Sequence, residues 1–533
     1  MKKGAAILVC VLLLATAFPV SARISGVTYY IDSISGSDEG NGLSPETAWK
    51  SVPVSAATLS AGDSVLFRRG GRYACALTLE NCIGTPDSPI RISAYGTGKM
   101  PVLYTDEATE VLRLFDCAYC VVSDLEITAP HGGGIWIDTL RRTSSGITLA
   151  NLRMHDIQNT AAQNRDLLGA GAAVARACVM VKGLPARSRF AVNNLTIKDC
   201  EMYDCGNGVS DWGSWNDSET PWDVDTKPDP VYNENHRIEN CSMHDMDAEA
   251  LIFGVCQNSV MTNCRCIDCC QGEGVDENGE ILYFTAAAWF WGADHCTIEH
   301  CEIAGQKNVG DGMTVDFDSQ SNYCTYQYIY SHDNVRFVCN NAKNVPQTGN
   351  VVRCCLSVND DGGRNLIASS HGESGMQFYN NTIVNSQDFY LAYLTDSLFV
   401  NNIVTFREGY ALRPDKCILP KYKNTFSRNC YSGTFPIPLT GAKFAETPGF
   451  AGNDITDPLS FRLSAQSPLL GAGADLKASG AETDFFSEPI RSKNIGCYGG
   501  VGVQSEFRRD APLQRLRQAI RSFLLFLPHF LFS

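Results

Sequence analysis

Residues 313–318 read MTVDFD, and apolar and polar side chains alternate strictly along them. A period of two predicts a half-buried β-strand. The apolar set should face a core and the polar set should face water: Met313, Val315 and Phe317 in the first, and Thr314, Asp316 and Asp318 in the second. Two carboxylates side by side on one face repel each other, which costs stability unless the face binds something. The exposed face of this strand is therefore a candidate site.

A six-residue template, apolar-x-x-Z-x-apolar, recurs along the chain with Z drawn from Leu, Cys, Gln or Asn. The Z positions are Leu125, Leu152, Cys200, Cys241, Cys264, Cys301, Gln327, Cys354, Asn381, Asn401 and Asn429. Most steps between them are 20–28 residues, which suits one coil of a solenoid built from short strands and turns.

Long helical patterns are missing, and Gly, Asn, Asp and Ser interrupt the chain throughout. The predicted fold class is all-β, an elongated parallel β-helix of about 10–13 coils. Leucine-rich repeats are the alternative, but they need a denser leucine pattern than this chain has.

The repeat also accounts for the cysteines, 22 of which lie beyond residue 22. Four of them share one template position and should stack in a column along the coil axis, which three asparagines continue: Cys200, Cys241, Cys264, Cys301, Asn381, Asn401 and Asn429. In an exported protein so many cysteines usually indicate disulfides. Because free cysteine packs as a small buried hydrophobe, the column predicts that most are reduced and structural.

The two ends differ from the repeats. Residues 1–22 combine Lys2 and Lys3 with a short apolar run and a small-residue exit, which predicts a secretory signal peptide and a secreted or cell-surface protein. Residues 501–533 form a basic and apolar tail, through which any membrane contact would run. Between them we expect one β-helix domain at 27–500, made of a cap with the first coils (27–110), central coils (111–435) and a closing segment (436–500).

The net charge of −15 and the pI near 5.1 argue against nucleic-acid binding and against general binding to anionic membranes. The sequence contains no GxSxG, HExxH or phosphate-binding GxxxxGK[ST] motif, and no CxxC motif has a matching second one at the spacing of a zinc cluster. We expect a monomer that binds no nucleic acid and holds no zinc cluster.

Stretches near both ends carry a family resemblance. They read YYIDSISGSDEGNGLSPETAWKSV (29–52), AGDSVLFRRG (61–70), SPIRISAYGTGKMPVL (88–103), FRLSAQSPLLGAGADL (461–476) and TDFFSEPIRSKNIGCYGG (483–500). They resemble the opening and closing segments of right-handed parallel β-helix proteins of the pectate-lyase superfamily, over about residues 27–500. That superfamily includes lyases, glycoside hydrolases, esterases and binding proteins, so the resemblance implies the fold more than the activity. The stretch AAAWFWGADHCTIEHCEI (286–303) also looks like β-helix proteins that act on carbohydrates, often as glycoside hydrolases.

Three template steps are long, at 48, 41 and 37 residues, and all lie between Leu152 and Cys301. Their extra residues should leave the coils as loops on one face and form a binding surface. Six of the seven tryptophans lie between residues 136 and 291, and aromatic faces among carboxylates suit sugar rings. Ordinary loop packing is the alternative for each tryptophan. The predicted substrate-binding residues are Trp215, Trp222, Trp289, Trp291, Asp311 and His332.

Counting along the template brings three acids together. Asp316 and Asp318 lie 15 and 17 residues after Cys301, and Glu280 lies 16 residues after Cys264, one coil earlier. If the coils are in register, Glu280 stacks about one strand spacing, ~4.8 Å, from the aspartate pair. Glycoside hydrolysis needs two carboxyl groups ~5–9.5 Å apart, one as acid and the other as nucleophile or base. These three acids are therefore the candidate catalytic residues.

Other functions fit the same residues. Clustered acids also suit calcium, or they are solvated surface groups, whereas the hydrolase hypothesis requires no cofactor. A polysaccharide lyase would use a basic residue and calcium, and Lys307, Arg336 and Arg364 are the nearest basic side chains. A non-catalytic glycan-binding or adhesin-like β-helix is the third hypothesis. His332-Asp333, like His155-Asp156 and His244-Asp245, follows a template and favours a structural turn.

Overall fold

The computed structural model describes residues 26–52, 59–107, 109–157, 177–181, 189–215, 230–272, 285–307, 312–340, 347–360, 367–369, 375–392, 394–406, 410, 412–413, 420–432, 443–444, 448–476 and 481–504. The regular structure in these ranges is β-strand, apart from the short 3-10 helices η1 (Pro45–Thr47), η6 (Pro420–Tyr422) and η7 (Pro458–Phe461). No helix in the described part is long and apolar enough to cross a membrane.

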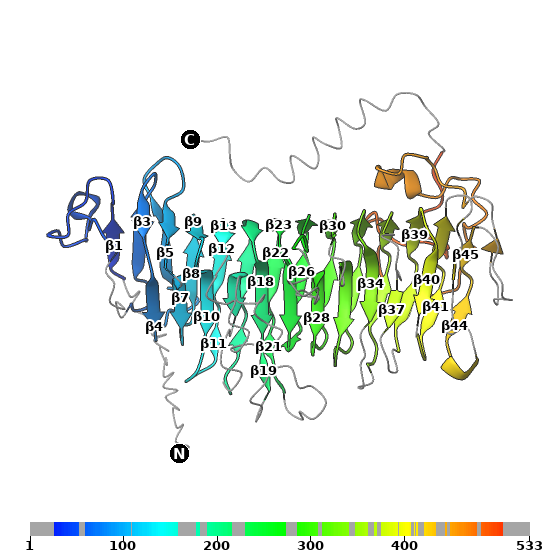
Figure 1. Ribbon diagram of the computed structural model, residues 1–533, viewed down its shortest axis with the longest axis horizontal. Helices are drawn as coiled ribbons and strands as arrows, with labels where there is room; N and C mark the ends of the chain where they lie inside the picture. The colour runs from blue at the N-terminus through cyan, green and yellow to red at the C-terminus, as the bar shows by residue number, and fades with distance from the viewer. Residues whose placement is uncertain are drawn as a thin grey trace, which may run out of the picture.

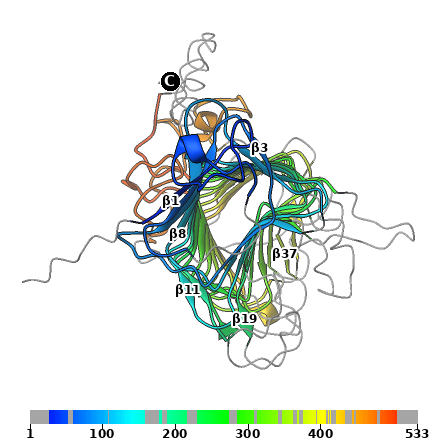
Figure 2. The same cartoon turned by 90° about the vertical axis from the view of Figure 1, so that its left-hand side faces the viewer.

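The chain winds into a solenoid in which each coil contributes one strand to each of three long parallel sheets (Figure 1). In chain order a coil passes through sheet I, then sheet II, then sheet III, and the three sheets surround one interior when viewed along the coils (Figure 2). Apolar side chains from all three sheets fill that interior as one continuous cluster. The predicted all-β, right-handed parallel β-helix is confirmed, and the predicted domain boundaries stay predictions.

Sheet I consists of β1 (Thr28–Ile31), β2 (Ser64–Arg68), β5 (Ile90–Tyr95), β8 (Cys120–Ser123), β12 (Thr148–Ala150), β16 (Thr196–Lys198), β22 (Arg237–Glu239), β26 (Val260–Thr262), β29 (Thr297–Glu299), β32 (Thr325–Gln327), β35 (Val351–Arg353), β38 (Gln377–Tyr379), β41 (Leu398–Val400) and β44 (Thr425–Ser427). Sheet II consists of β3 (Arg72–Ala74), β6 (Val102–Tyr104), β9 (Glu126–Ala129), β13 (Arg153–Ile157), β17 (Glu201–Cys205), β23 (Ser242–Met246), β27 (Arg265–Ile267), β30 (Glu302–Ala304), β33 (Tyr330–His332), β36 (Leu356–Val358), β39 (Thr382–Asn385), β42 (Ile403–Phe406), β45 (Cys430–Tyr431) and β46 (Lys443–Phe444).

Sheet III consists of β4 (Leu77–Glu80), β7 (Glu110–Phe115), β10 (Gly133–Asp138), β14 (Ala177–Val181), β18 (Asn207–Trp212), β24 (Leu251–Gly254), β28 (Ala286–Trp291), β31 (Met313–Asp318), β34 (Arg336–Asn340), β37 (Ile367–Ser369), β40 (Phe389–Ala392) and β43 (Leu412–Arg413). A short parallel sheet contains β11 (Ser144–Ser145), β15 (Val192–Asn193), β21 (Asn233–Glu234) and β25 (Cys256–Gln257), and β19 (Ser214–Trp215) pairs antiparallel with β20 (Pro230–Val231).

The template marks the corner between sheets I and II. The residue before Z has a left-handed backbone, with φ of 61° at Asp124, 51° at Asn151 and 55° at Asn240. Asn and Asp tolerate this conformation better than other non-glycine residues, because their short polar side chains hydrogen-bond locally. This preference explains why Asp or Asn so often precedes Z.

The same corner corrects three predicted Z positions. The left-handed residues of the later coils are Tyr328, Cys354 and Asn401, so the stacked residues are Ile329, Cys355 and Asn402. Backbone hydrogen bonds agree, because Leu356 N donates to Ile329 O and Ile403 N donates to Asn381 O. The predictions of Gln327, Cys354 and Asn401 were wrong by one or two residues, since several apolar residues in these coils fit the ends of the template.

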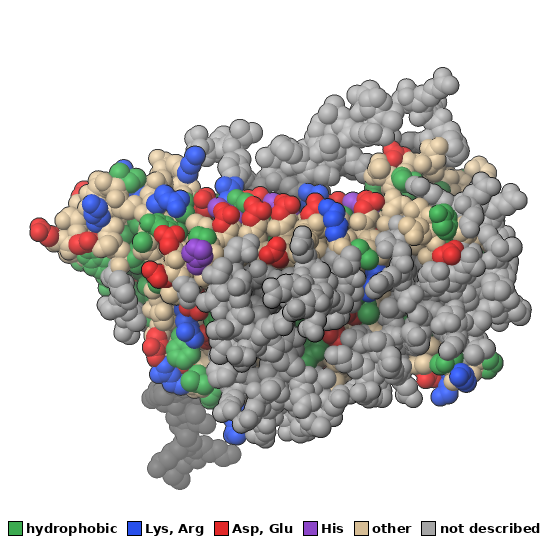
Figure 3. All heavy atoms as spheres, viewed as in Figure 1, with side chains coloured by type: hydrophobic (Ala, Val, Ile, Leu, Met, Phe, Trp, Pro, Cys, Tyr) green, Lys and Arg blue, Asp and Glu red, His purple; other side chains and the backbone are tan. Residues whose placement is uncertain are grey.

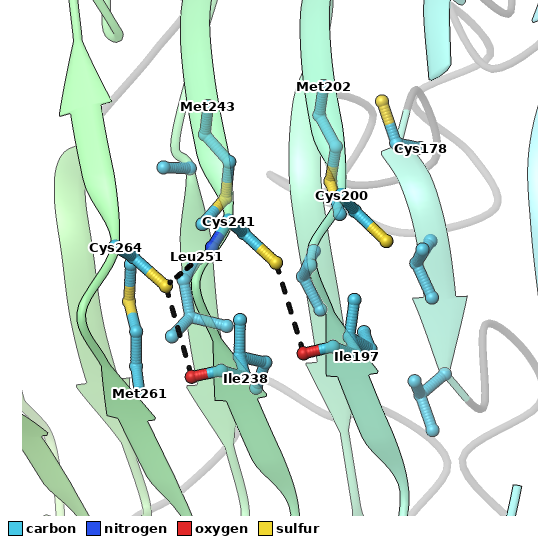
Figure 4. Packing of buried hydrophobic residues seen from close by; sticks show 14 of the residues in the cluster. Cys178, Ile197, Cys200, Met202, Ile238, Cys241, Met243, Leu251, Met261 and Cys264 are labelled. Atoms are coloured by element: carbon cyan, nitrogen blue, oxygen red, sulfur yellow. Dashed lines mark hydrogen bonds between the residues drawn. The ribbon is translucent and has the colours of Figure 1, made fainter. Parts of the chain in front are cut away.

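Figure 4 shows Cys200, Cys241 and Cys264 on successive coils, with their side chains inside the solenoid among methionines and aliphatic residues. Cys241 N donates to Cys264 Sγ at 3.4 Å, and Cys264 Sγ donates to Ile238 O at 3.9 Å. All 21 cysteines in the described ranges are buried. Burial raises the pKa of Cys264 and of Cys266 well above the usual value, so these thiols stay protonated and unreactive. The predicted buried column is confirmed.

The asparagines continue the column as a ladder. Asn381 Nδ2 donates to Asn402 Oδ1, and Asn402 Nδ2 donates to Asn429 Oδ1, both at 3.1 Å. The backbone N–H groups of Asn381 and Asn402 donate to the same oxygens at 2.9 and 2.8 Å. A ladder of this kind satisfies buried amides that would otherwise destabilise the interior.

The outer face of sheet II has two different halves. Over its earlier strands, acidic, basic and histidine side chains form a band along the upper edge of the molecule (Figure 3), in which Arg153 Nε donates to Glu201 Oε2 at 2.9 Å. Over its later strands, Phe461 and Cys497 of the closing segment pack on Leu356 and Val358. The closing segment thus covers the later strands of sheet II.

Candidate functional site

The strand β31 departs from strict alternation. Val315 and Phe317 lie in the core as predicted, but Met313 packs outside it with Ala286 and Cys339, and Thr314 points inward. The predictions for Met313 and Thr314 were therefore wrong. The strands of sheet III bend where they leave the corner with sheet II, so two consecutive residues face inward and the register of β31 on β28 passes from Met313 directly to Val315.

Thr314 belongs to a polar network inside the solenoid. Its hydroxyl lies 2.6 Å from Ser331 Oγ and accepts from Asn334 Nδ2 at 2.8 Å. Asn334 Nδ2 also donates to Asp360 Oδ1 at 2.8 Å, and the hydroxyl of Ser357 donates to Asp360 Oδ2 at 2.6 Å. Because every member has partners, the network can hold this part of β31 in place.

Asp316 and Asp318 lie together on the outer face of sheet III. Strand register places Asp316 beside Trp289 and Asp318 beside Trp291 of the preceding coil. Asp316 is only 7% exposed, so this face is not in open water as the alternation alone predicted. The two Cα atoms are separated by two residues of an extended strand, ~6.6 Å. The site thus pairs each carboxylate with an indole.

The indoles belong to a larger aromatic cluster. Trp212 and Trp291 pack with ring centroids 5.4 Å apart and planes at 63°. Ala177, Met180, Ile252 and Val255 complete the buried group. Trp136 and Trp289 pack against it from the side. These two rings are only partly buried, so they are the part of the cluster that can bind the C–H face of a sugar ring.

Core aromatic residues hold β31 from behind. Phe317 stacks on Phe290 of β28 with centroids 5.9 Å apart. The hydroxyl of Tyr326 crosses the interior and donates to the backbone oxygen of Asp316 at 2.6 Å. Burial, and next the nearby Asp316, raise the pKa of Tyr326 well above its usual value, so it remains a donor. This bond fixes the backbone that carries the two acids.

Another carboxylate on this face was missed by the sequence analysis. Glu249 lies two residues before the start of β24 and is 3% exposed, with Oε1 accepting from Asn207 Nδ2 at 2.7 Å and Oε2 accepting from Thr285 Oγ1 at 2.9 Å. The only sequence signal is an acid at the start of the apolar strand LIFG. This signal does not show that Glu249 lies near Asp316, because the template steps between them vary in length.

The residue count used to align Glu280 with the aspartates does not match the strand register. Trp289 lies 25 residues after Cys264, whereas its neighbour Asp316 lies 15 residues after Cys301, so the earlier coil holds ten more residues than the count assumed. Glu280, Asp311 and Trp222 lie outside the described residues. Trp215 is described only by its backbone, which pairs with Pro230 beyond the end of β18.

His332 lies away from these acids, on the outer face of sheet II. Its Nδ1 lies 2.8 Å from Asp333 Oδ2 and its Nε2 3.4 Å from Glu302 Oε1. Asp333 has a φ of 58°, which is the turn conformation, and the same ring-to-aspartate contact of 2.7 Å occurs at His244 and Asp245. The structure supports the turn interpretation, and the prediction that His332 lies beside the site was wrong.

The described ranges contain no cluster of metal-binding side chains that would support the calcium alternative. In them no three His, Cys, Asp or Glu side chains converge in a way that could hold a metal ion. Arg336 of β34, a candidate base for a lyase, is 8% exposed and lies on the outer face in register with Met313. Lys307 is 71% exposed and pairs with Asp268 at 3.8 Å, and Arg364 lies outside the described residues.

No protein-family model and no curated protein matches the chain. Among solved structures it is similar to the GH136 lacto-N-biosidase from Eubacterium ramulus, with 20% identity and a TM-score of 0.53 over 73% of this chain and 65% of that one. This chain thus spans just under two thirds of that protein's length. It is also similar to the complex of XylC with xylose, with 11% identity and a TM-score of 0.52 over 90% of this chain and 99% of that one. At these identities the likeness shows the parallel β-helix fold, as the predicted resemblance implied.

Proposed function

We propose that this protein is an exported glycoside hydrolase that cleaves a polysaccharide or oligosaccharide with Asp316 and Asp318. The observation that carries the proposal is the placement of these two carboxylates on one shielded face, each beside a tryptophan of the preceding coil. Sequence-remote residues gathered in this way supply both the acid pair and the aromatic surface that a glycosidase needs.

The spacing suits the chemistry. Carboxyl groups ~5–5.5 Å apart serve retaining hydrolysis and groups ~6.5–9.5 Å apart serve inverting hydrolysis. A Cα separation of ~6.6 Å on one strand face allows either arrangement by rotation of the side chains. One carboxyl group would protonate the leaving oxygen, and the other would attack the sugar or activate water. Removal from water and a neighbouring acid both favour one protonated and one ionised group.

The direct test replaces each acid by its amide. Wild type, Asp316→Asn, Asp318→Asn and the control Asp333→Asn, on the exposed turn of sheet II, are incubated with neutral and uronate polysaccharides. New reducing ends and the ultraviolet absorbance of unsaturated products are recorded. The proposal predicts reducing ends without absorbance, lowered by ~100-fold or more in both site variants and unchanged in the control.

Two other outcomes would overturn it. Absorbance that survives Asp316→Asn would favour a polysaccharide lyase, for which the buried Arg336 on the same face is the basic residue to test next. Binding of glycans with no product, equal in wild type and Asp316→Asn, would favour a non-catalytic glycan-binding protein.

A further inference from the structure

A buried polar group lies on the outer face of sheet III, and the proposed reaction does not use it. Asn207 of β18, Glu249 before β24 and Thr285 before β28 are 0%, 3% and 3% exposed. Since Val209 pairs with Leu251 and Leu251 with Ala288, Asn207 and Glu249 occupy neighbouring positions two residues earlier. Glu249 is level with Met313, so it lies two strands from Asp316, about 10 Å across the sheet, and three residues earlier along the strand direction.

Glu249 is held as an acceptor. Asn207 Nδ2 donates to one carboxylate oxygen at 2.7 Å and the hydroxyl of Thr285 donates to the other at 2.9 Å. An ionised carboxylate can accept at both of its oxygens. A buried negative charge is stabilised by additional donors and destabilised by another anion. The group therefore favours a ligand that brings O–H or N–H donors.

Asn207 and Trp289 add one unpartnered atom each. Asn207 Oδ1 is a buried acceptor and Trp289 Nε1 is a buried donor, and neither has a hydrogen-bond partner among the described residues. Trp289 packs against two apolar clusters, one that contains Ile252 and one that contains Ala286. Ala286 is the residue of β28 that lies level with Glu249. Buried amides and indoles in native proteins are rarely left unpaired, so these atoms indicate a bound polar group.

We propose that Asn207, Glu249 and Trp289 form a subsite for a saccharide unit that carries hydroxyl or amino groups and no carboxylate. The inference rests on the proposed function and names its substrate class. A sugar hydroxyl donates to Asn207 Oδ1 or Glu249 and accepts from Trp289 Nε1. A uronate carboxylate offers no donor to these acceptors and is repelled by Glu249. The subsite thus selects neutral or amino sugars over uronic acids.

The test is calorimetric binding of three hexasaccharide classes, namely neutral gluco-, xylo- and galacto-oligosaccharides, chitosan oligomers and oligogalacturonate. The Asp316→Asn protein serves as the parent, so that turnover does not confound binding. Glu249→Gln keeps the shape of the side chain and an oxygen that accepts from Asn207. Trp289→Phe removes the indole N–H and the five-membered ring that carries it. Glu239→Gln on sheet I is the matched control. We expect a neutral or amino member to bind, at least tenfold more weakly with Glu249→Gln, several-fold more weakly with Trp289→Phe and equally with the control.

Preferred binding of oligogalacturonate, no binding of any neutral or amino member, or an unchanged affinity in Glu249→Gln would each overturn the subsite. Thermal unfolding of every variant separates lost binding from lost folding, and Trp289→Phe keeps the test valid if Glu249→Gln unfolds. The proposed function fails separately. Loss of affinity in Glu249→Gln with no hydrolysis by wild type refutes the hydrolase and keeps the subsite, whereas hydrolysis that depends on Asp316 but not on Glu249 does the reverse.

Discussion

Trp212 and Trp291 meet on the outer face of sheet III with ring centroids 5.4 Å apart, across Gly254 of the strand between them. A Cβ atom on Gly254 would lie 2.4 Å from Trp212 Cε3. Glycine at this position is thus what lets the two indoles approach each other over the intervening strand.

The variant Gly254→Ala should therefore separate the two indoles. We expect a changed near-ultraviolet circular dichroism spectrum, an unchanged far-ultraviolet spectrum and at least tenfold lower activity on the substrate found for wild type, because a small shift of positioning residues is costly. Near-ultraviolet spectra that superimpose would contradict the packing described for these rings.

The asparagine ladder makes a prediction about stability. Asn402→Ala removes the acceptor for two N–H donors of Asn381 and the donor to Asn429 and Phe378, all buried. Unsatisfied buried groups cost ~1–3 kcal/mol each, so the free energy of unfolding should fall by about 3 kcal/mol or more. Urea unfolding measures it, and Cys301→Ala, which removes only a thiol from the same column, should cost clearly less.

Asp360 should make stability depend on pH. Burial, which outweighs the bonds from Ser331, Ser357 and Asn334, raises its pKa to about 6 from 3.8. Because the pKa of Asp360 is higher in the folded protein, its protonated carboxyl group adds to the free energy of unfolding. This contribution is fully present below pH 3.8 and is lost as pH rises through 6. The loss is about 3 kcal/mol by pH 7.5, on the basis of 1.36 kcal/mol for each pKa unit.

The comparison is wild type against Asp360→Asn in urea at pH 4.5 and pH 7.5. The amide carries no charge at either pH, so the variant should lose less stability than wild type over this range. An identical change in both proteins would show that Asp360 does not carry the effect.

The pair of His332 and Glu302 on sheet II has a different pH window. Burial lowers the pKa of His332, but Glu302 and Asp333 together outweigh it and raise the pKa above 6.5. Burial opposes ionisation of Glu302, yet bonds from His332 and Arg265 lower its pKa from 4.5 to about 2. The His332 contribution is lost as pH rises through its raised pKa, and the Glu302 contribution is lost as pH falls through 2.

Both contributions are therefore complete between about pH 4.5 and 6.5. His332→Asn should destabilise the protein by ~1 kcal/mol at pH 5.5 and by less at pH 9, as measured by urea unfolding. A larger cost at pH 9 would mean that packing, and not charge, is what His332 contributes.

The repeated template was enough to predict the solenoid, because each coil uses the same local corner and stacks on its neighbours. The left-handed residue before Z, the small buried Cys and Asn columns and the alternation of Val315 and Phe317 are all local or periodic features. A single sequence contains them directly. The pair of Asp316 and Asp318 was predicted for the same reason, since it needs only one strand.

What surrounds that pair was decided by the tertiary structure. The lengths of the connections set the register, and ten extra residues in the earlier coil placed Trp289 and Trp291 beside the two acids. The bend of sheet III turned Thr314 inward and Met313 outward, which strict alternation cannot foresee. Asn207 and Glu249 meet on strands 42 residues apart in the sequence. Their contact follows from the stacking of whole coils. Which side chains meet on neighbouring coils depends on the length of every connection between them.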